Sequence, residues 1–184
     1  MSNTKMPKDS NALNVLTLFA NYGFRKASMN EIATAAGLSR QSIYNQFGSK
    51  EAVLDWAVTS FLDTITDRAL HCLGTADAPA TQTLVSAYQA WIGDHLPLVR
   101  GTPHGAELLD QTKSAAESST RDYEGEFTRA IETFLLTRGM APSEEAAKDA
   151  AYVLNLASKG LLLKVGTPDD YARSLERVIN VLFR

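Results

Sequence analysis

The chain has 184 residues, of which 45% are hydrophobic and 21% are charged, and its formal net charge is −3 at pH 7. This composition excludes an intrinsically disordered chain, which would combine low hydrophobicity with high net charge. No apolar run approaches the roughly 20 residues that a membrane-spanning helix needs, and the first ten residues lack the apolar stretch of a secretory signal. We therefore expect a cytoplasmic protein.

The first predicted helix has one apolar face. Its hydrophobic residues recur at the spacing i, i+3, i+4, i+7 and i+8, and Gly23 follows as a residue that commonly ends a helix. The stripe comprises Ala12, Val15, Leu16, Phe19 and Ala20.

Two short helices are predicted next. Ser28 and Glu31 have the spacing of a capping box, so a helix is expected over 28–36. After a glycine turn, Ser39 can cap a third helix over 40–47. Two short helices joined by such a turn are typical of a helix-turn-helix.

The rest of the chain also has helical spacing, and no segment alternates apolar and polar residues as a half-buried strand does. We therefore predict an all-α fold of nine helices. Prolines and glycines interrupt residues 97–105, so only a short or irregular helix is expected directly after them. The six further helices are predicted from Ser49, over 84–95, over 106–112, over 118–138, over 143–165 and from Thr167 to the end.

Charge is distributed unevenly along the chain. Residues 1–50 contain six basic and two acidic side chains, a charge of +4, whereas residues 51–184 contain 12 basic and 19 acidic side chains, a charge of −7. A basic segment joined to an acidic one suits a protein that attracts phosphate at one end, although chance alone can produce such an imbalance.

A set of residues over about 40 positions resembles the DNA-binding signature of the tetracycline-repressor (TetR) family in both order and spacing. The resemblance implies a bacterial transcription regulator with a DNA-binding domain over 1–50 and a ligand-binding and dimerisation domain over 51–184. Repression of a palindromic operator, relieved by a small molecule, is the implied activity. The matching residues are Phe24, Ser28, Met29, Asn30, Glu31, Ile32, Ala33, Ala36, Gly37, Leu38, Ser39, Ile43, Tyr44, Phe47, Ser49, Lys50 and Glu51.

Contact with double-stranded DNA is expected from the third helix and its surroundings. Arg40, Gln41 and Asn45 carry groups able to bond base edges, although an ordinary solvated helix face is the alternative. Tyr44 and Lys50 resemble the phosphate-contacting pair of the family. Arg25 and Lys26 suit contact and solvation equally. The full predicted set is Ser28, Ser39, Arg40, Gln41, Ser42, Tyr44, Asn45 and Lys50.

A homodimer is expected, because one recognition helix contacts too few base pairs for useful specificity. The last two predicted helices are rich in alanine and leucine and would form a four-helix bundle with a second copy. Packing within one chain is the alternative. The predicted interface residues are Ala150, Val153, Leu154, Ala157, Leu161, Leu175, Val178 and Leu182.

A small-molecule site is expected in the second domain, where the resemblance implies an inducer cavity. Aromatic residues at helical spacing are more often plain core, and core and pocket draw on the same side chains. His95 and His104 flank the interrupted region and suit a pocket better than a metal site. The candidate residues are Trp56, Phe61, Tyr88, Trp91, His95, His104, Phe127 and Phe134.

Catalysis is not expected. The sequence has no glycine-rich phosphate loop, no Gly-x-Ser-x-Gly motif and no dinucleotide fingerprint, and its single cysteine, Cys72, cannot form a disulfide within the chain. We therefore expect no cofactor and no metal. The rival interpretation is a helical, dimeric interaction adaptor that does not bind DNA.

Overall fold

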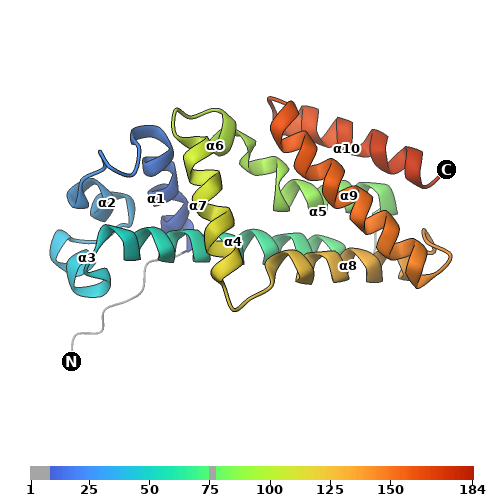
Figure 1. The fold of residues 1–184 in the computed structure, drawn as a ribbon, viewed down its shortest axis with the longest axis horizontal. Helices are drawn as coiled ribbons and strands as arrows, with labels where there is room; N and C mark the ends of the chain where they lie inside the picture. The colour runs from blue at the N-terminus through green and yellow to red at the C-terminus, as the bar shows by residue number, and fades with distance from the viewer. Residues whose placement is uncertain (1–8, 75–77) are drawn as a thin grey trace. The chain divides into compact units, whose positions relative to one another are not determined.

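The computed structural model describes residues 9–74 and 78–184, and within these ranges all of its regular secondary structure is helical (Figure 1). All nine predicted helices are present, which confirms the all-α fold with an N-terminal helix-turn-helix. A short 3-10 turn and one further short helix add to them. The elements are α1 Asp9–Tyr22, α2 Met29–Ala35, α3 Arg40–Phe47, α4 Lys50–Leu73, α5 Ala80–Trp91, η1 Gly93–His95, α6 Leu96–Arg100, α7 Gly105–Ser118, α8 Tyr123–Thr137, α9 Glu144–Lys164 and α10 Pro168–Leu182.

Side-chain caps start several of these helices where the sequence places them. The hydroxyl of Ser143 accepts the Ala146 N–H at the start of α9, and the hydroxyl of Thr167 accepts the Asp170 N–H at the start of α10. Each cap satisfies an amide that has no partner inside its helix. Local chemistry therefore fixes these two starts.

The segment around residues 92–123 differs from the prediction. Residues 96–100 form α6. The helix accommodates Pro97 because this proline lies in the first turn, where a missing N–H removes no intrahelical hydrogen bond. α7 extends to Ser118, and α8 starts at Tyr123 instead of 118 because the Asp122 carboxylate accepts the Gly125 N–H at 2.9 Å. The predicted helix over 84–95 ends at Trp91, and η1 follows it.

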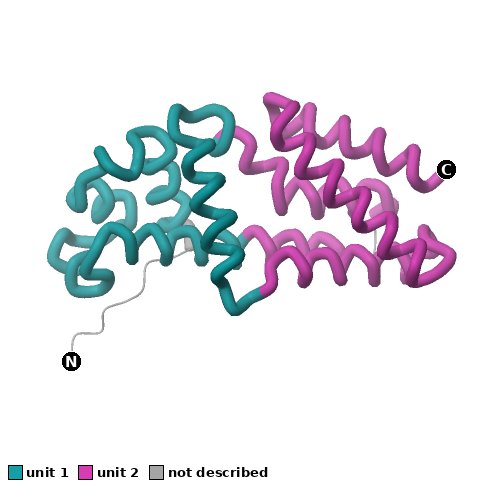
Figure 2. The backbone as a smooth tube through the Cα atoms, in the orientation of Figure 1, with its two compact units in different colours: residues 1–64, 98–121 teal, residues 65–97, 122–184 magenta. Residues whose placement is uncertain are grey.

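The backbone divides into two compact units (Figure 2). Unit 1 comprises residues 1–64 and 98–121, and α4 passes out of it at Thr64. Within unit 1, α1 packs against α2 and α7, and α2 packs against α3. Unit 1 contains the helix-turn-helix, part of α4, part of α6 and all of α7. The predicted boundary at residue 50 stays a prediction.

Unit 2 comprises residues 65–97 and 122–184, in which α10 packs against α5 and α9, and α8 packs against α9. Its core contains a chain of paired polar groups. The Tyr88 hydroxyl donates to Asn155 Oδ1 at 2.7 Å, and Asn155 Nδ2 donates to Thr128 Oγ1 at 2.8 Å. Burial raises the pKa of Tyr88 well above its ordinary value, so its hydroxyl remains a donor. These bonds fix the register of α5, α8 and α9, since each buried polar group would otherwise lose a partner.

Candidate nucleic-acid interface

A closed capping box begins α2. The Ser28 N–H donates to Glu31 Oε2 at 2.8 Å, and the Glu31 N–H donates back to Ser28 Oγ at 3.3 Å. The side-chain hydrogen bond from Ser28 is the main reason that the pKa of Glu31 lies below its ordinary value. The serine that the sequence assigned to DNA contact is therefore first of all a helix cap, and its exposed position still allows contact with a phosphate.

A small apolar core holds α2 and α3 together. Ile32, Ala36 and Ile43 have no exposed area, and Leu38 lies half-buried in the turn between the helices. Helices of seven and eight residues would not be stable alone, so this core determines their arrangement. It thereby presents the opposite face of α3 to the solvent.

The exposed face of α3 carries four of the predicted contact residues. Arg40, Gln41, Tyr44 and Asn45 are all exposed, Tyr44 by 43%. The Arg40 guanidinium lies 5.8 Å from the centroid of the Tyr44 ring. A cation, an amide pair and a phenol on one face of a helix provide donors for both base edges and phosphates.

Ser39 and Ser42 have a local role at the start of α3. The Ser39 hydroxyl accepts the Ser42 N–H at 3.0 Å, and the two hydroxyl oxygens lie 2.8 Å apart. Both side chains therefore already form hydrogen bonds with each other, although Ser39 remains exposed.

Lys50 does not point freely into the solvent. Its Nζ donates to the backbone oxygens of Phe24 at 2.7 Å, Arg25 at 3.2 Å and Ala27 at 2.9 Å. An ammonium group has three N–H donors, so all of them are used within the chain. This arrangement differs from the predicted phosphate contact by Lys50. The neighbouring Arg25 and Lys26 are exposed.

The predicted ligand residues are divided between the two units. Trp56, Phe61 and His104 belong to unit 1, and the other five belong to unit 2. Tyr88 and Phe127 have no exposed area, and the Trp91 and Phe127 ring centroids are 4.3 Å apart. These aromatic side chains fill the core. Their spacing in the sequence alone does not distinguish a core from a pocket.

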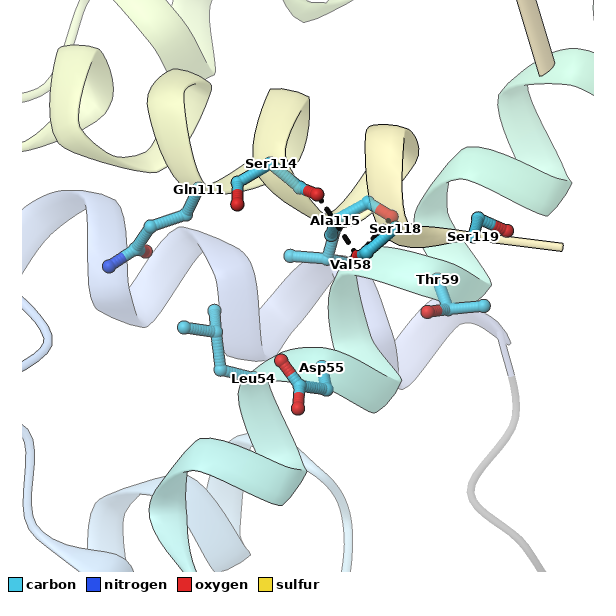
Figure 3. A pocket seen from close by; sticks show the side chains of 9 residues that line it. All are labelled: Leu54, Asp55, Val58, Thr59, Gln111, Ser114, Ala115, Ser118 and Ser119. Atoms are coloured by element: carbon cyan, nitrogen blue, oxygen red, sulfur yellow. Dashed lines mark hydrogen bonds between the residues drawn. The ribbon is translucent and has the colours of Figure 1, made fainter. Parts of the chain in front are cut away.

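The structure has a surface hollow in each unit. One of about 430 Å³ lies between α4 and α7 in unit 1, where Asp55, Thr59 and Gln111 contribute polar groups (Figure 3). It includes none of the predicted ligand residues. The other, of about 520 Å³, lies in unit 2 and includes Phe134. The central carbon of the Arg138 guanidinium lies 5.4 Å from the centroid of the Phe134 ring.

The two candidate histidines have partners within their own units. His95 Nε2 lies 3.0 Å from the Ala90 oxygen, and burial lowers the pKa of His95 from its ordinary value. His104 Nδ1 lies 3.5 Å from a Glu107 carboxylate oxygen. Across residues 9–74 and 78–184, no three metal-ligating side chains come together.

Large apolar side chains are exposed along one face of α9, and others are exposed near the end of α10. Of the predicted interface residues, Val153 and Leu182 are exposed, whereas Ala150, Ala157, Leu161 and Val178 are half-buried. Leu154 and Leu175 have no exposed area, because they pack inside their own protomer. Large exposed side chains outside the predicted interface set are Tyr152, Leu156 and Leu163 of α9 and Val181 of α10.

The phase of the helix explains this difference. Residues 147, 151, 154 and 158 of α9 are buried, whereas 152, 156 and 163 are exposed. Both stripes have helical spacing, so one sequence cannot assign them to core and surface without knowing which side faces the protomer.

None of the helices in the part that the structure describes is long and apolar enough to span a bilayer.

The region that contains the helix-turn-helix matches a known protein family. Residues 16–56 match the family described as bacterial regulatory proteins, tetR family. Over 97 residues the chain is 35% identical to the HTH-type transcriptional repressor KstR2 of Mycolicibacterium smegmatis, covering 51% of this chain and 47% of that protein. The repressor of the same name from Rhodococcus jostii is 35% identical over 82 residues, covering 43% of this chain and 40% of that protein. These matches span less than half of each relative.

Solved structures share the fold over nearly the whole chain. A transcriptional regulator from Rhodococcus sp. Rha1 is similar with a TM-score of 0.69 at 18% identity, covering 97% of this chain and 96% of that one. A TetR transcriptional regulator from Streptomyces coelicolor has a TM-score of 0.68 at 20% identity, covering 95% and 97%. At such low identity the likeness shows the fold alone.

Proposed function

We infer that this chain, a member of the TetR family of bacterial regulatory proteins, is a transcriptional regulator that binds operator DNA. The observation that carries this proposal is the exposed polar face of α3, which the buried core of the helix-turn-helix turns outward. A recognition helix reads base edges in the major groove with such a face. A regulator of this kind acts in the cytoplasm, where its DNA lies.

Each exposed residue of α3 receives a role in this proposal. Gln41 and Asn45 carry amides suited to adenine, and Arg40 carries a fork suited to guanine. Tyr44 and Ser39 lie where hydroxyl groups can donate to phosphate oxygens, and Ser28 does so from the start of α2.

We further propose that two copies associate through α9 and α10. The supporting observation is the exposed apolar face, on which Tyr152 is 65%, Leu156 54% and Leu163 69% exposed. Large apolar side chains that gather on one face of a soluble protein commonly mark an interface. Twofold pairing of this face would give a four-helix bundle and a palindromic operator.

Repression relieved by a small molecule is the proposed mode of action. It is supported by two relatives, matched over 51% and 43% of this chain, that are named transcriptional repressors. A ligand that favours one separation of the two recognition helices shifts the DNA equilibrium by its differential affinity, typically about 1–3 kcal/mol. The hollow that includes Phe134 is one place in unit 2 where such a ligand would fit.

Titration with double-stranded DNA at several salt concentrations tests the proposal against the adaptor alternative. A mixed-sequence duplex should bind with an affinity that falls steeply as salt increases, since bound cations are released from the phosphates. The doubly substituted Arg40→Ala, Gln41→Ala protein is the control and should bind more weakly. An interaction adaptor would show no affinity for the duplex at any salt concentration.

A further inference from the structure

We propose that the hollow between α4 and α7 in unit 1 binds a small organic cation with an apolar body, and that this ligand acts on the helix-turn-helix. The hollow has a volume of about 430 Å³, and Figure 3 shows side chains of α4 on one of its walls and side chains of α7 on the other. The effect on DNA rests on the proposed function, whereas the binding of the cation does not.

Four polar side chains of the hollow have hydrogen-bonding groups to spare. Within residues 9–74 and 78–184, none of the four forms a side-chain hydrogen bond or an ion pair. They are Asp55 and Thr59 of α4 and Gln111 and Ser114 of α7. A ligand can therefore bond to both walls without breaking a bond inside the protein, which would otherwise reduce its affinity.

The charge of the hollow selects a cation. Among the lining residues that the structure describes, Asp55 alone is charged. Basic side chains nearby in the sequence have acidic partners, since Lys113 Nζ lies 3.9 Å from Asp110 and Arg121 Nη1 lies 2.9 Å from Asp63. An ammonium group would meet a carboxylate and several oxygen acceptors, whereas an anionic ligand would be repelled by Asp55.

Apolar side chains of the same hollow require a ligand with an apolar body. Leu54 is 9% exposed and Val58 is 1% exposed, and Ala115 lies half-buried on the wall that α7 provides. Covering apolar surface stabilises a complex roughly in proportion to the area removed from water. A hydrated metal ion would leave this surface uncovered, so an organic ammonium fits the hollow better.

Both walls of the hollow are attached to the helix-turn-helix within unit 1. α4 follows α3, and the Trp56 and Phe47 ring centroids are 5.2 Å apart. α7 packs against α1, and the His104 N–H at its start donates to the Ala20 oxygen at 2.9 Å. A ligand that bonds to both walls favours one spacing of α4 and α7, and thereby one placement of α3 against α1. It changes the DNA affinity by its differential affinity for the two placements.

Three probes that share one apolar body test the site, namely 4-phenylbutylamine, 4-phenylbutanol and 4-phenylbutyrate. Titration of the full chain should shift the backbone amide NMR signals of residues 54–59 and 111–119. The ammonium should bind about fivefold more tightly than the alcohol, and the carboxylate should bind most weakly. No binding, equal binding of the three probes, or shifts confined to other residues would overturn the site.

Matched variants assign the preference to one carboxylate. Asp55→Asn should bind the ammonium and the alcohol equally. The control is Glu117→Gln, the same chemical change at an exposed position of α7 outside the hollow, and it should keep the preference. Ala115→Leu fills the hollow and should weaken the binding of all three probes. An unchanged preference in Asp55→Asn would overturn the assignment.

Addition of 4-phenylbutylamine to a complex with a mixed-sequence duplex tests the action on the helix-turn-helix. At saturation it should change the DNA affinity of the wild type about fivefold. Asp55→Asn at the same probe concentration controls for competition at the phosphates and should show little change. Binding of the probe without an effect on DNA affinity would overturn this action. If the wild type binds no duplex, the proposed function fails, while the shifts of the free protein still decide the cation site.

Discussion

The imidazole of His104 lies directly against Gly23. A Cβ atom added at Gly23 would come within 2.9 Å of His104 Cε1, and the His104 N–H donates to the Ala20 oxygen at 2.9 Å. The end of α1 is thus joined to the start of α7 by this hydrogen bond, and a Cβ atom at residue 23 would crowd the imidazole. Gly23 also has a φ of +83°, which L side chains adopt with strain.

Gly23→Ala should therefore destabilise the protein more than an alanine at a comparable but open glycine. Gly48 has a φ of +74° and no atom within 4 Å of a Cβ built on it, so Gly48→Ala measures the backbone strain alone. We expect losses of about 1 kcal/mol for Gly48→Ala and about 2–3 kcal/mol for Gly23→Ala, measured by urea unfolding. Equal losses would show that the ring of His104 moves away without cost.

Stability should decrease as His95 becomes protonated. Burial lowers the pKa of His95 below its ordinary value of 6.5, so the unfolded chain takes up the proton more readily than the folded protein. The contribution of His95 is fully present above about pH 6.5 and is lost as the pH falls through the lower folded value. His95→Gln should flatten the decline in unfolding free energy between about pH 7 and about pH 5. The same decline in both proteins would contradict a buried neutral imidazole.

A charge placed on the exposed face of α9 should give a folded monomer. Leu156→Glu together with Leu163→Glu would bury two carboxylates without partners in the proposed dimer, whereas both positions are solvated in one protomer. Light scattering should report a dimer for the wild type and a monomer for the double variant. The control is Leu136→Glu on α8, where the leucine is 37% exposed. A double variant that remains dimeric would place the interface elsewhere.

Deletion of α10 is a poorer test of the same interface. Tyr171, Leu175 and Ile179 of this helix have no exposed area. Removing α10 would therefore open the core of unit 2, and loss of the dimer would follow from unfolding alone.

Gln41→Ala should reduce discrimination between DNA sequences. Loss of a bidentate amide contact with a base is expected to weaken binding to the preferred operator by about 1–3 kcal/mol, with little change on unrelated duplexes. Fluorescence anisotropy on both kinds of duplex measures the difference. The control is Gln82→Ala, an exposed position on α5. Equal weakening on all sequences would assign Gln41 to the DNA backbone.

Features set by neighbouring residues could be predicted from the sequence. The caps at Ser28, Ser39, Ser143 and Thr167 need only residues two or three positions away, and all four are present. The predicted start of α8 at residue 118 is wrong, because Asp122 supplies the cap and the helix begins at Tyr123.

Long-range contacts could not be predicted in this way. The carbonyl partners of Lys50 lie 23 to 26 residues away, and Tyr88 and Asn155 are 67 positions apart. Likewise, the spacing of Leu154 is the same whether it faces its own core or a second copy, since helical periodicity does not identify the partner.

Selection of bound duplexes from a random pool tests the central claim most directly, namely that the exposed face of α3 reads operator DNA. We predict enrichment of one palindromic motif whose half-sites are centred about one helical turn of DNA, roughly 34 Å, or a multiple of it apart. A pool that retains its random composition after repeated rounds at low salt would contradict the claim.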